Sequence, residues 1–344
     1  MERLRETEIF NDPKLRRNIE VRSEVNLETR LYFHNKGYIE TETPILTPDP
    51  EVAPVKPFVI ENPECYLRIT DTEFLKRLMY AGFGKIFQLA KDFREGDSNY
   101  KSNPEFTQLS IAARGIDYEQ MVGVFKDYMS SVAKKVNDTP VISFFGSRIN
   151  LETDWSEITV KDALAKFCDI DLDKNLENSD LEKTMERLKV PVPSEAKNYY
   201  GVIKYNIMME SILDKFIMPE YKGKILFLKE YPYGLNAPGK AVEDKPQYKQ
   251  RGEVFVNGIE IINGSTIPTN PDFIKSWYDH ALKAQLDSGL WPGKRLDEDY
   301  LRSTRLGIPH MSAMTLGYDR YIMMLTNSKN ISEVITFPII LKSK

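Results

Sequence analysis

Residues 93–106 read Phe-Arg-Glu-Gly-Asp-Ser-Asn-Tyr-Lys-Ser-Asn-Pro-Glu-Phe, and residues 316–320 read Leu-Gly-Tyr-Asp-Arg. In the first segment Arg94 precedes a polar loop of hairpin size, and Lys101 and Phe106 follow it. Cationic side chains form strong charge-assisted hydrogen bonds with phosphate oxygens, and an aromatic ring offers its face to a base. The pattern predicts a cradle for a nucleoside triphosphate, with Arg320 closing over the base by a guanidinium–ring contact.

The chain has the size and composition of a globular enzyme. It holds 344 residues, 41% of them hydrophobic and 28% charged, and we find no internal repeat or low-complexity linker, so we expect one domain over residues 1–344. No apolar run approaches the roughly 20 residues of a membrane span, and the N-terminus lacks a secretory signal. Cys65 and Cys168 are too few for a disulfide framework, which favours a reducing cytoplasm. A net charge of −4 gives no global nucleic-acid footprint, although a local basic strip can exist on an acidic protein.

The hydrophobic pattern predicts helices mixed with widely spaced strands. We expect a long helix over residues 12–36 that ends at Gly37, then a β-rich run over 38–46 that contains Pro44. Further strands are expected at 65–69, 85–90, 106–113, 225–228 and 252–262, a helix at 314–325, and a charged helical insertion around 179–222. Without regular βαβ units, this order indicates an α+β fold with a largely antiparallel sheet.

Two glutamates are candidates for binding magnesium. Glu253 and Glu260 lie seven residues apart in a strand-like segment and would face opposite sides of a regular strand. A bulge or a turn at Asn257-Gly258 would bring them to one face. Carboxylate oxygens suit Mg²⁺, so we expect ATP and Mg²⁺ as the cofactors.

The two opening segments resemble motifs 2 and 3 of class II aminoacyl-tRNA synthetases, the helix and the proline-interrupted strand expected over residues 12–46 resemble motif 1, and residues 10–44 resemble the start of the catalytic domain. The order is that of subclass IIb, the lysyl, aspartyl and asparaginyl enzymes, and residues 103–107, 297–301, 307–309 and 325–338 are similar to the same family. The resemblance covers nearly the whole chain and implies a class II antiparallel sheet flanked by helices and a homodimer. It places ATP on Arg94 at the α-phosphate, Lys101 at the γ-phosphate, Phe106 and Arg320 around the adenine, and Glu95, Ser102 and Glu253 nearby.

The expected amino-acid pocket departs from the family pattern. Lysyl-type enzymes have a Glu and a Tyr at the positions of Ser110 and Ala112, and an aromatic residue and a Glu at Ser265 and Ile267; aspartyl and asparaginyl enzymes have an Arg at the Ile267 position. Because these charged partners are missing, we expect a smaller or less charged substrate than lysine. We expect Glu73 or Asp71 to bind the α-ammonium group and Asn263 the carboxylate. Motif 2 also departs, since Gly96 occupies the place of the acidic residue that reads the adenine amino group.

Three hypotheses for function follow from these resemblances. We expect an ATP-dependent ligase that forms an aminoacyl-adenylate and passes it to tRNA, protein, a small amine or ammonia. The chain begins where the family's catalytic domain begins, so we expect no anticodon-binding OB-fold; it is thus similar to elongation factor P–lysine ligase and archaeal-type asparagine synthetase. This favours amide formation or protein-lysine ligation over anticodon-dependent charging. The alternative that is not an enzyme is a non-catalytic paralogue that binds an amino acid and acts as a regulator.

Overall fold

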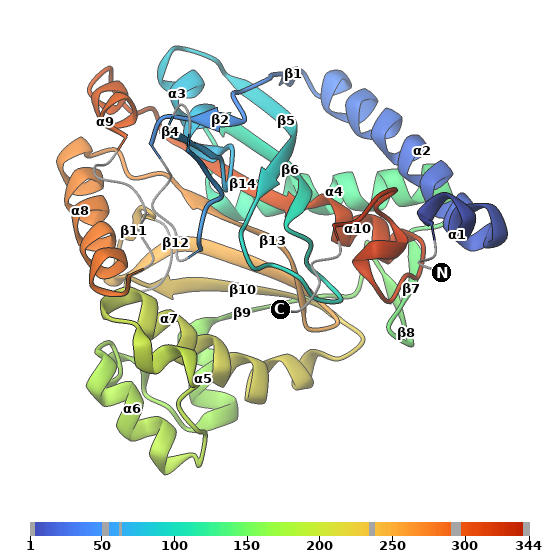
Figure 1. The fold of residues 1–344 in the computed structure, drawn as a ribbon. Helices are drawn as coiled ribbons and strands as arrows, with labels where there is room; N and C mark the ends of the chain where they lie inside the picture. Colours follow the sequence, from blue (N-terminus) through green and yellow to red (C-terminus); the bar gives the residue numbers. More distant parts are fainter. Residues whose placement is uncertain (1–3, 50–54, 62–63, 234–237, 290–296, 340–344) are drawn as a thin grey trace.

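A mixed nine-stranded sheet forms the centre of the protein (Figure 1). The computed structural model describes residues 4–49, 55–61, 64–233, 238–289 and 297–339. The strand order is β1-β5-β6-β14-β13-β12-β10-β9, with β11 paired to β12. The bounds are β1 Ile39–Glu40, β5 Lys85–Phe93, β6 Glu105–Arg114, β9 Trp155–Thr159, β10 Ile225–Pro232, β11 Ala241–Val242, β12 Lys245–Val256, β13 Ile259–Thr266 and β14 Met311–Gly317.

The pairing confirms the predicted α+β class. The six strands from β5 to β10 are joined by antiparallel pairs. Parallel pairs occur at the two edges, β1 with β5 and β9 with β10. Two small sheets lie apart from the centre, one formed by β2 (Leu46–Thr47), β3 (Val59–Glu61) and β4 (Glu64–Leu67), the other by β7 (Val141–Phe144) and β8 (Ser147–Asn150).

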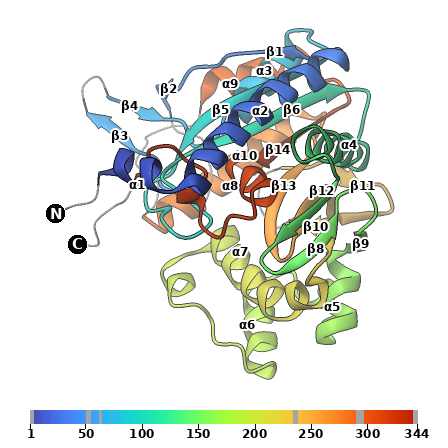
Figure 2. The same ribbon diagram turned by 90° about the vertical axis from the view of Figure 1, so that its right-hand side faces the viewer.

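Helices cover both faces of the central sheet (Figures 1 and 2). α2, α4 and α10 pack on one face in a core that includes Phe87 and Ile111. α3, α8 and α9 pack on the other face against Ile86 and Ala112. The alternation of neighbouring residues between the two cores follows from the two-residue period of a strand. The bounds are α1 Arg5–Asn11, α2 Pro13–Asn35, α3 Thr72–Tyr80, α4 Tyr118–Asn137, α8 Pro271–Asp287, α9 Glu298–Thr304 and α10 Tyr318–Leu325.

A third core joins the helical segment to the sheet edge. α5 (Val160–Cys168), α6 (Asn178–Arg187) and α7 (Gly201–Ile212) pack together against β10 and β12. Short helical turns at Glu195–Asn198, Leu213–Ile217 and Met218–Tyr221 complete the stretch in which we expect an insertion. In this arrangement α7 lies beside α8 (Figure 1).

Local sequence signals explain where several elements begin and end. The Asp12 carboxylate accepts hydrogen bonds from the backbone N–H groups of Lys14 and Leu15 and so caps α2. Gly37 follows with a φ of +77°, which glycine adopts without steric strain. The Asn257-Gly258 turn, with φ of +51° and +80°, joins β12 to β13 as Asn-Gly pairs do in hairpins. Within the described residues, we find no helix long and apolar enough to cross a membrane.

Three predicted elements are wrong in extent. The strand expected over residues 252–262 is divided by the Asn257-Gly258 turn into β12 and β13. Residues 314–317 belong to β14, and only the following residues form α10. The apolar run there covers a strand buried on both faces and a buried helix, which periodicity does not distinguish. The β-rich run over 38–46 forms strand only at Ile39–Glu40 and at the start of β2, because Pro44 lacks the N–H group that a continuous ladder needs.

Candidate active site

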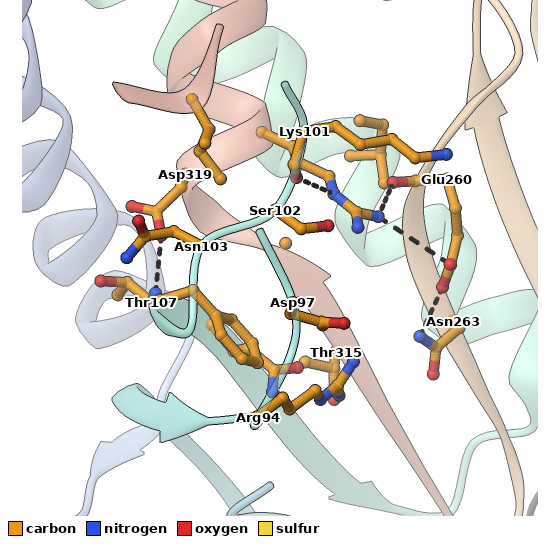
Figure 3. Close-up of a pocket in the computed structure, with 16 residues that line it drawn as sticks. Arg94, Asp97, Lys101, Ser102, Asn103, Thr107, Glu260, Asn263, Thr315 and Asp319 are labelled. Atoms are coloured by element: carbon orange, nitrogen blue, oxygen red, sulfur yellow. Dashed lines mark hydrogen bonds and ion pairs between the residues drawn. The ribbon is translucent and has the colours of Figure 1, made fainter. Parts of the chain in front are cut away.

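The loop between β5 and β6 is held as a hairpin beside the end of the sheet. The Arg94 N–H donates to the Pro104 carbonyl at 2.9 Å, and Asn99 and Ser102 form an isolated bridge farther out. The Arg94 guanidinium lies 4.9 Å from the centre of the Phe106 ring. Arg94 and Phe106 therefore line the same cavity, and Arg94 lies beside Asp97 and Thr315 there (Figure 3).

Arg320 connects this loop to β13. Its Nε donates to the Lys101 carbonyl at 3.1 Å, and its Nη1 donates to the Glu260 carbonyl at 2.7 Å. The same Nη1 lies 3.9 Å from Glu260 Oε2. Two arginines that are 226 positions apart thus line one cavity, together with Lys101, Ser102 and Phe106.

Asp319 fixes the position of β6 relative to α10. It is 2% exposed, and it accepts hydrogen bonds from the Thr107 N–H at 2.7 Å and from Arg22 Nη1 of α2 at 2.6 Å. Buried carboxylates require such partners. Sequence reasoning missed both Asp319 and Arg22, although Asp319 stands directly before the arginine of the motif-3-like segment.

The hairpin turn brings the two predicted magnesium glutamates to one cavity. Glu253 on β12 pairs in register with Asn263, and Glu260 on β13 pairs with Phe255 across an irregularity between Val254 and Phe255. Both carboxylates line the space between the sheet and α7. The turn, rather than a bulge alone, achieves this arrangement.

The environments of the two glutamates differ. Glu253 is buried and accepts hydrogen bonds from Tyr231 and Arg251, each at 2.8 Å. Burial raises the pKa of Glu253, and Arg251 opposes this shift. Glu260 accepts from Asn263 Nδ2 at 2.7 Å. In the described part of the chain, no group of three or more His, Cys, Asp or Glu side chains is placed to hold a metal ion, so Mg²⁺ would need phosphate oxygens as additional ligands.

A carboxylate from the helical segment faces the same glutamates. Glu210 on α7 lines the cavity that holds Glu253 and Glu260, and its pKa is raised to about 7 by burial and by the charges of these two residues. Sequence reasoning missed Glu210 because nothing in the local pattern distinguishes it from the solvated charges of an amphipathic helix.

A second cavity of about 280 Å³ opens beside the first. The two cavities share Arg94, Gln108, Glu260, Asn263 and Thr315. The other lining side chains come from the start of α3, from β12, from α7 and from α8: Thr70, Thr72, Val202, Ile203, Asn206, Glu210, Arg251, Glu253, Trp277, Ala281 and Gln285. Two cavities therefore meet at Arg94.

The remaining expected residues lie outside these linings. We consider the first cavity, the second cavity and the cavity between the sheet and α7 that holds Glu253, Glu260 and Glu210. Among the described residues, none of these three is lined by Glu95, Asp71, Glu73, Ser110, Ala112, Ser265 or Ile267. Glu95 forms an ion pair with Lys56 at 2.8 Å, and Glu73 is buried and accepts a hydrogen bond from Tyr278. Asp71 is buried and accepts from Ser110 Oγ at 2.6 Å. Burial and the neighbouring Asp92 raise the pKa of Asp71 to about 7.

Asp97 is a further residue that sequence reasoning missed. It follows Gly96, whose φ is +91°, and it lines the first cavity (Figure 3). In the motif 2 pattern, Gly96 occupies the place of the acidic residue that reads the adenine amino group. A carboxylate one position later reaches the same cavity because glycine permits the loop to turn.

Comparison with known proteins agrees with this fold. The profile of the family described as tRNA synthetases class II (D, K and N) matches residues 3–340. This chain therefore belongs to the class II tRNA synthetases of the D, K and N type.

The curated relatives are lysine–tRNA ligases. That of Clostridium perfringens (strain SM101 / Type A) is 29% identical over 342 residues, which cover 98% of this chain and 67% of the relative. That of Saccharolobus solfataricus is 30% identical over 336 residues, covering 96% and 66%. That of Magnetococcus marinus is 27% identical over 341 residues, covering 98% and 66%. The chain spans about two thirds of the length of these relatives.

The relatives support an aminoacyl-ligase activity for this chain. They give no support to the expectation that lysine is not the substrate, since the relatives named above are lysine ligases. The missing charged positions alone do not settle the substrate, because a cavity is defined by all the elements around it.

Proposed function

We propose that this protein activates an α-amino acid with ATP and transfers the aminoacyl group to an acceptor. The observation that carries the proposal is the shared wall of the two cavities, where Arg94 faces both compartments. A carboxylate bound in one compartment and a triphosphate bound in the other would meet beside this guanidinium.

In the first step a carboxylate oxygen of the amino acid attacks the α-phosphorus of ATP. The bond between the α-phosphorus and the bridging oxygen breaks, and pyrophosphate leaves with that oxygen. Arg94 would stabilise the negative charge that develops on the α-phosphate oxygens, and Asn263 would orient the attacking carboxylate. Lys101 and Arg320 would hold the leaving phosphates and the adenine ring.

In the second step an acceptor nucleophile attacks the carbonyl carbon of the adenylate. The bond to the phosphate oxygen breaks, and AMP leaves. The acceptor remains open between a tRNA end, a protein lysine, a small amine and ammonia.

The carboxylates fit a magnesium site. Glu253 and Glu260 provide hard oxygen donors on one wall; Glu260 Oε1 accepts from Asn263, and Glu260 Oε2 lies 3.9 Å from Arg320 Nη1. Bound Mg²⁺ would neutralise phosphate charge at this wall. Tyr231 and Arg251 would keep Glu253 oriented.

We also propose a cytoplasmic homodimer that pairs through α2 and β1. Leu27 and Leu31 of α2 and Ile39 of β1 are exposed, which is typical of a surface that another subunit covers. Sedimentation velocity checks this proposal: the wild type should sediment as a dimer, and the Leu31→Glu variant should shift toward monomer. A monomeric wild type at micromolar concentration would contradict it.

ATP–pyrophosphate exchange tests the enzymatic proposal. The protein is incubated with labelled pyrophosphate, ATP, Mg²⁺ and each of the twenty amino acids in turn. Return of label to ATP with at least one amino acid is the expected result. Nucleotide binding without exchange for any amino acid would instead favour the non-catalytic regulator.

A further inference from the structure

The second cavity has a neighbour at the start of α7, which lies between α6 and α8 (Figure 1). A cavity of about 390 Å³, which we call the outer cavity, lies where the starts of α6 and α7 meet the end of β10 and the start of β12. Val202 lines both cavities, whereas Arg94 lines the second cavity and not the outer one. The two spaces therefore meet at the first turn of α7. The described lining of the outer cavity consists of Leu176, Glu177, Asn178, Gly201, Val202, Tyr205, Tyr233 and Gln247.

The polar side chains around the outer cavity offer mainly acceptor atoms. The hydroxyl groups of Tyr205 and Tyr233 donate to backbone carbonyl oxygens at 2.6 and 3.0 Å. Gln247 Nε2 donates to Asp173 at 3.2 Å. Burial and the charge of Glu177 raise the pKa of Tyr205, so this hydroxyl group keeps its proton. A ligand in the outer cavity would therefore meet oxygen atoms whose own donors are already used within the protein.

Two acceptor groups at the outer cavity lack a partner in the described part of the chain. Asn178 Nδ2 donates to the Gly201 carbonyl at 3.0 Å, while Asn178 Oδ1 is buried without a hydrogen-bond partner. Glu177 is exposed at the N-cap position of α6, and its side chain forms no capping hydrogen bond. Lys204 of α7 forms an ion pair with Glu182 at 2.5 Å rather than with Glu177. Because a buried acceptor without a partner is costly, a donor from a ligand would stabilise this wall.

The lining favours an ammonium group as the ligand. A primary ammonium group carries three N–H donors, one positive charge and no acceptor, so it can bind a carboxylate and a carbonyl oxygen at once. An aromatic face attracts the same charge. A carboxylate or phosphate group would face the charge of Glu177, and the described lining holds no Lys, Arg or His to compensate it. The outer cavity is therefore suited to a cation with N–H donors.

On the basis of the proposed function, we propose that the outer cavity binds one ammonium group of the acceptor, and that the acceptor is a small alkyl diamine. Glu177 and Asn178 hold this ammonium group. Because Arg94 does not line the outer cavity, the held group is not the nucleophile. The chain of the diamine extends past Val202 and brings its second amine to the adenylate.

In the transfer step the second amine attacks in its neutral form. Its nitrogen forms a bond with the carbonyl carbon of the adenylate, and the bond from that carbon to the phosphate oxygen breaks. AMP leaves with the bonding electrons, and the nitrogen releases one proton to solvent. The product is an amide that retains the held ammonium group.

Acyl transfer to two matched amines tests this proposal on the full chain. The protein is incubated with ATP, Mg²⁺, the amino acid that supports exchange and either 1,5-diaminopentane or pentylamine, and mass spectrometry measures the amide. We expect kcat/KM for the diamine to exceed that for the monoamine by roughly fivefold, the upper range for one exposed ion pair. Glu177→Gln removes the charge and should abolish this preference. Glu186→Gln, the same substitution at an exposed residue of α6, should keep it.

Titration calorimetry without ATP measures the same contact directly. We expect 1,5-diaminopentane to bind the wild type and Glu186→Gln alike, and to bind Glu177→Gln roughly fivefold more weakly. Gln247→Lys adds a positive charge to the lining and serves as a second variant, which should weaken binding by a similar factor. Equal binding to all four proteins, or an unchanged preference for the diamine in Glu177→Gln, would overturn the proposal.

This proposal and the proposed function fail in different ways. If an amino acid supports pyrophosphate exchange but the diamine neither binds nor is acylated, the outer cavity is not an acceptor site and the ligase function stands. If the diamine binds through Glu177 but no amino acid supports exchange, the ligase function and the acceptor role both fall, and the binding of an ammonium group in the outer cavity stands.

Discussion

The first and the second cavity share a wall but are built differently. The first cavity, which we propose binds the nucleotide, is lined by a few short segments: the β5–β6 loop with the start of β6, the start of β13 and the β14–α10 junction. Arg320 donates to the Lys101 and Glu260 carbonyls, and Asp319 accepts from the Thr107 N–H, so hydrogen bonds hold these segments together. The second cavity, which we propose binds the amino acid, is also lined by α7 and α8, and its shape therefore depends on how these helices pack.

The largest expected effect on activity comes from substitution of Arg94, which lines both cavities. Arg94→Ala should lower the rate of pyrophosphate exchange by roughly 10²–10³-fold, the loss typical for removal of one group that stabilises transition-state charge. Arg302→Ala on the exposed side of α9 serves as control and should exchange like the wild type. Equal rates for Arg94→Ala and the wild type would show that Arg94 does not stabilise the transition state.

Asp319 lines the first cavity, and we expect its substitution to lower the stability of the fold. Asp319→Asn removes the buried charge that holds Arg22 and the Thr107 N–H. We expect the free energy of unfolding to fall by about 2 kcal/mol, the range of hydrogen bonds to charged groups. Urea denaturation measures this change. A variant as stable as the wild type would mean that β6 and α10 are fixed by apolar packing alone.

The buried carboxyl group of Asp71 predicts a pH dependence of the free energy of unfolding. The pKa of Asp71 is raised to about 7 when folded, above the value of about 3.9 in an unfolded chain. The folded state thus binds the proton more tightly, and this contribution to stability is lost as pH rises toward 7. Between pH 5 and 7, we expect the free energy of unfolding to fall by about 2 kcal/mol, since the pKa of about 7 already includes the opposing effects of Arg68 and Ser110.

Asp71→Asn should abolish this decrease, because asparagine keeps an acceptor for Ser110 and does not titrate. Urea denaturation of both proteins at pH 5, 6, 7 and 8 provides the measurement. Parallel curves for the two proteins would show that Asp71 is not the titrating group.

The smallest effects distinguish two neighbouring acidic residues of the loop. Asp97 lines the nucleotide cavity, whereas Glu95 pairs with Lys56 on the surface. Asp97→Ala should raise the KM for ATP several-fold, and Glu95→Ala should change it by less than about twofold, as exposed ion pairs contribute little. The reverse order in exchange kinetics would restore the prediction that Glu95 binds ATP.

Sequence alone predicts the fold and brings together residues that line the first cavity, for physical reasons. Arg94, Lys101 and Phe106 lie within one hairpin, so their spacing already limits their relative positions. The Asn257-Gly258 pair likewise predicts the turn that joins the two glutamates.

The second cavity could not be predicted in the same way. Ser110 donates to Asp71, and Ile267 packs in one core with Ala112, which the position of a residue along a strand does not reveal. Glu210 lies on a helix whose pattern resembles an ordinary amphipathic helix. Its place at the second cavity depends on how α7 packs against the sheet, which no local pattern encodes.

The most direct test of the account is a crystal structure with ATP, Mg²⁺ and the amino acid that supports the most rapid exchange. The account predicts an adenylate or its substrates across the shared wall, with the α-phosphate at Arg94, the adenine between Phe106 and Arg320, and the α-carboxylate beside Asn263. Nucleotide density elsewhere, or Arg94 and Arg320 in contact with different ligands, would contradict it.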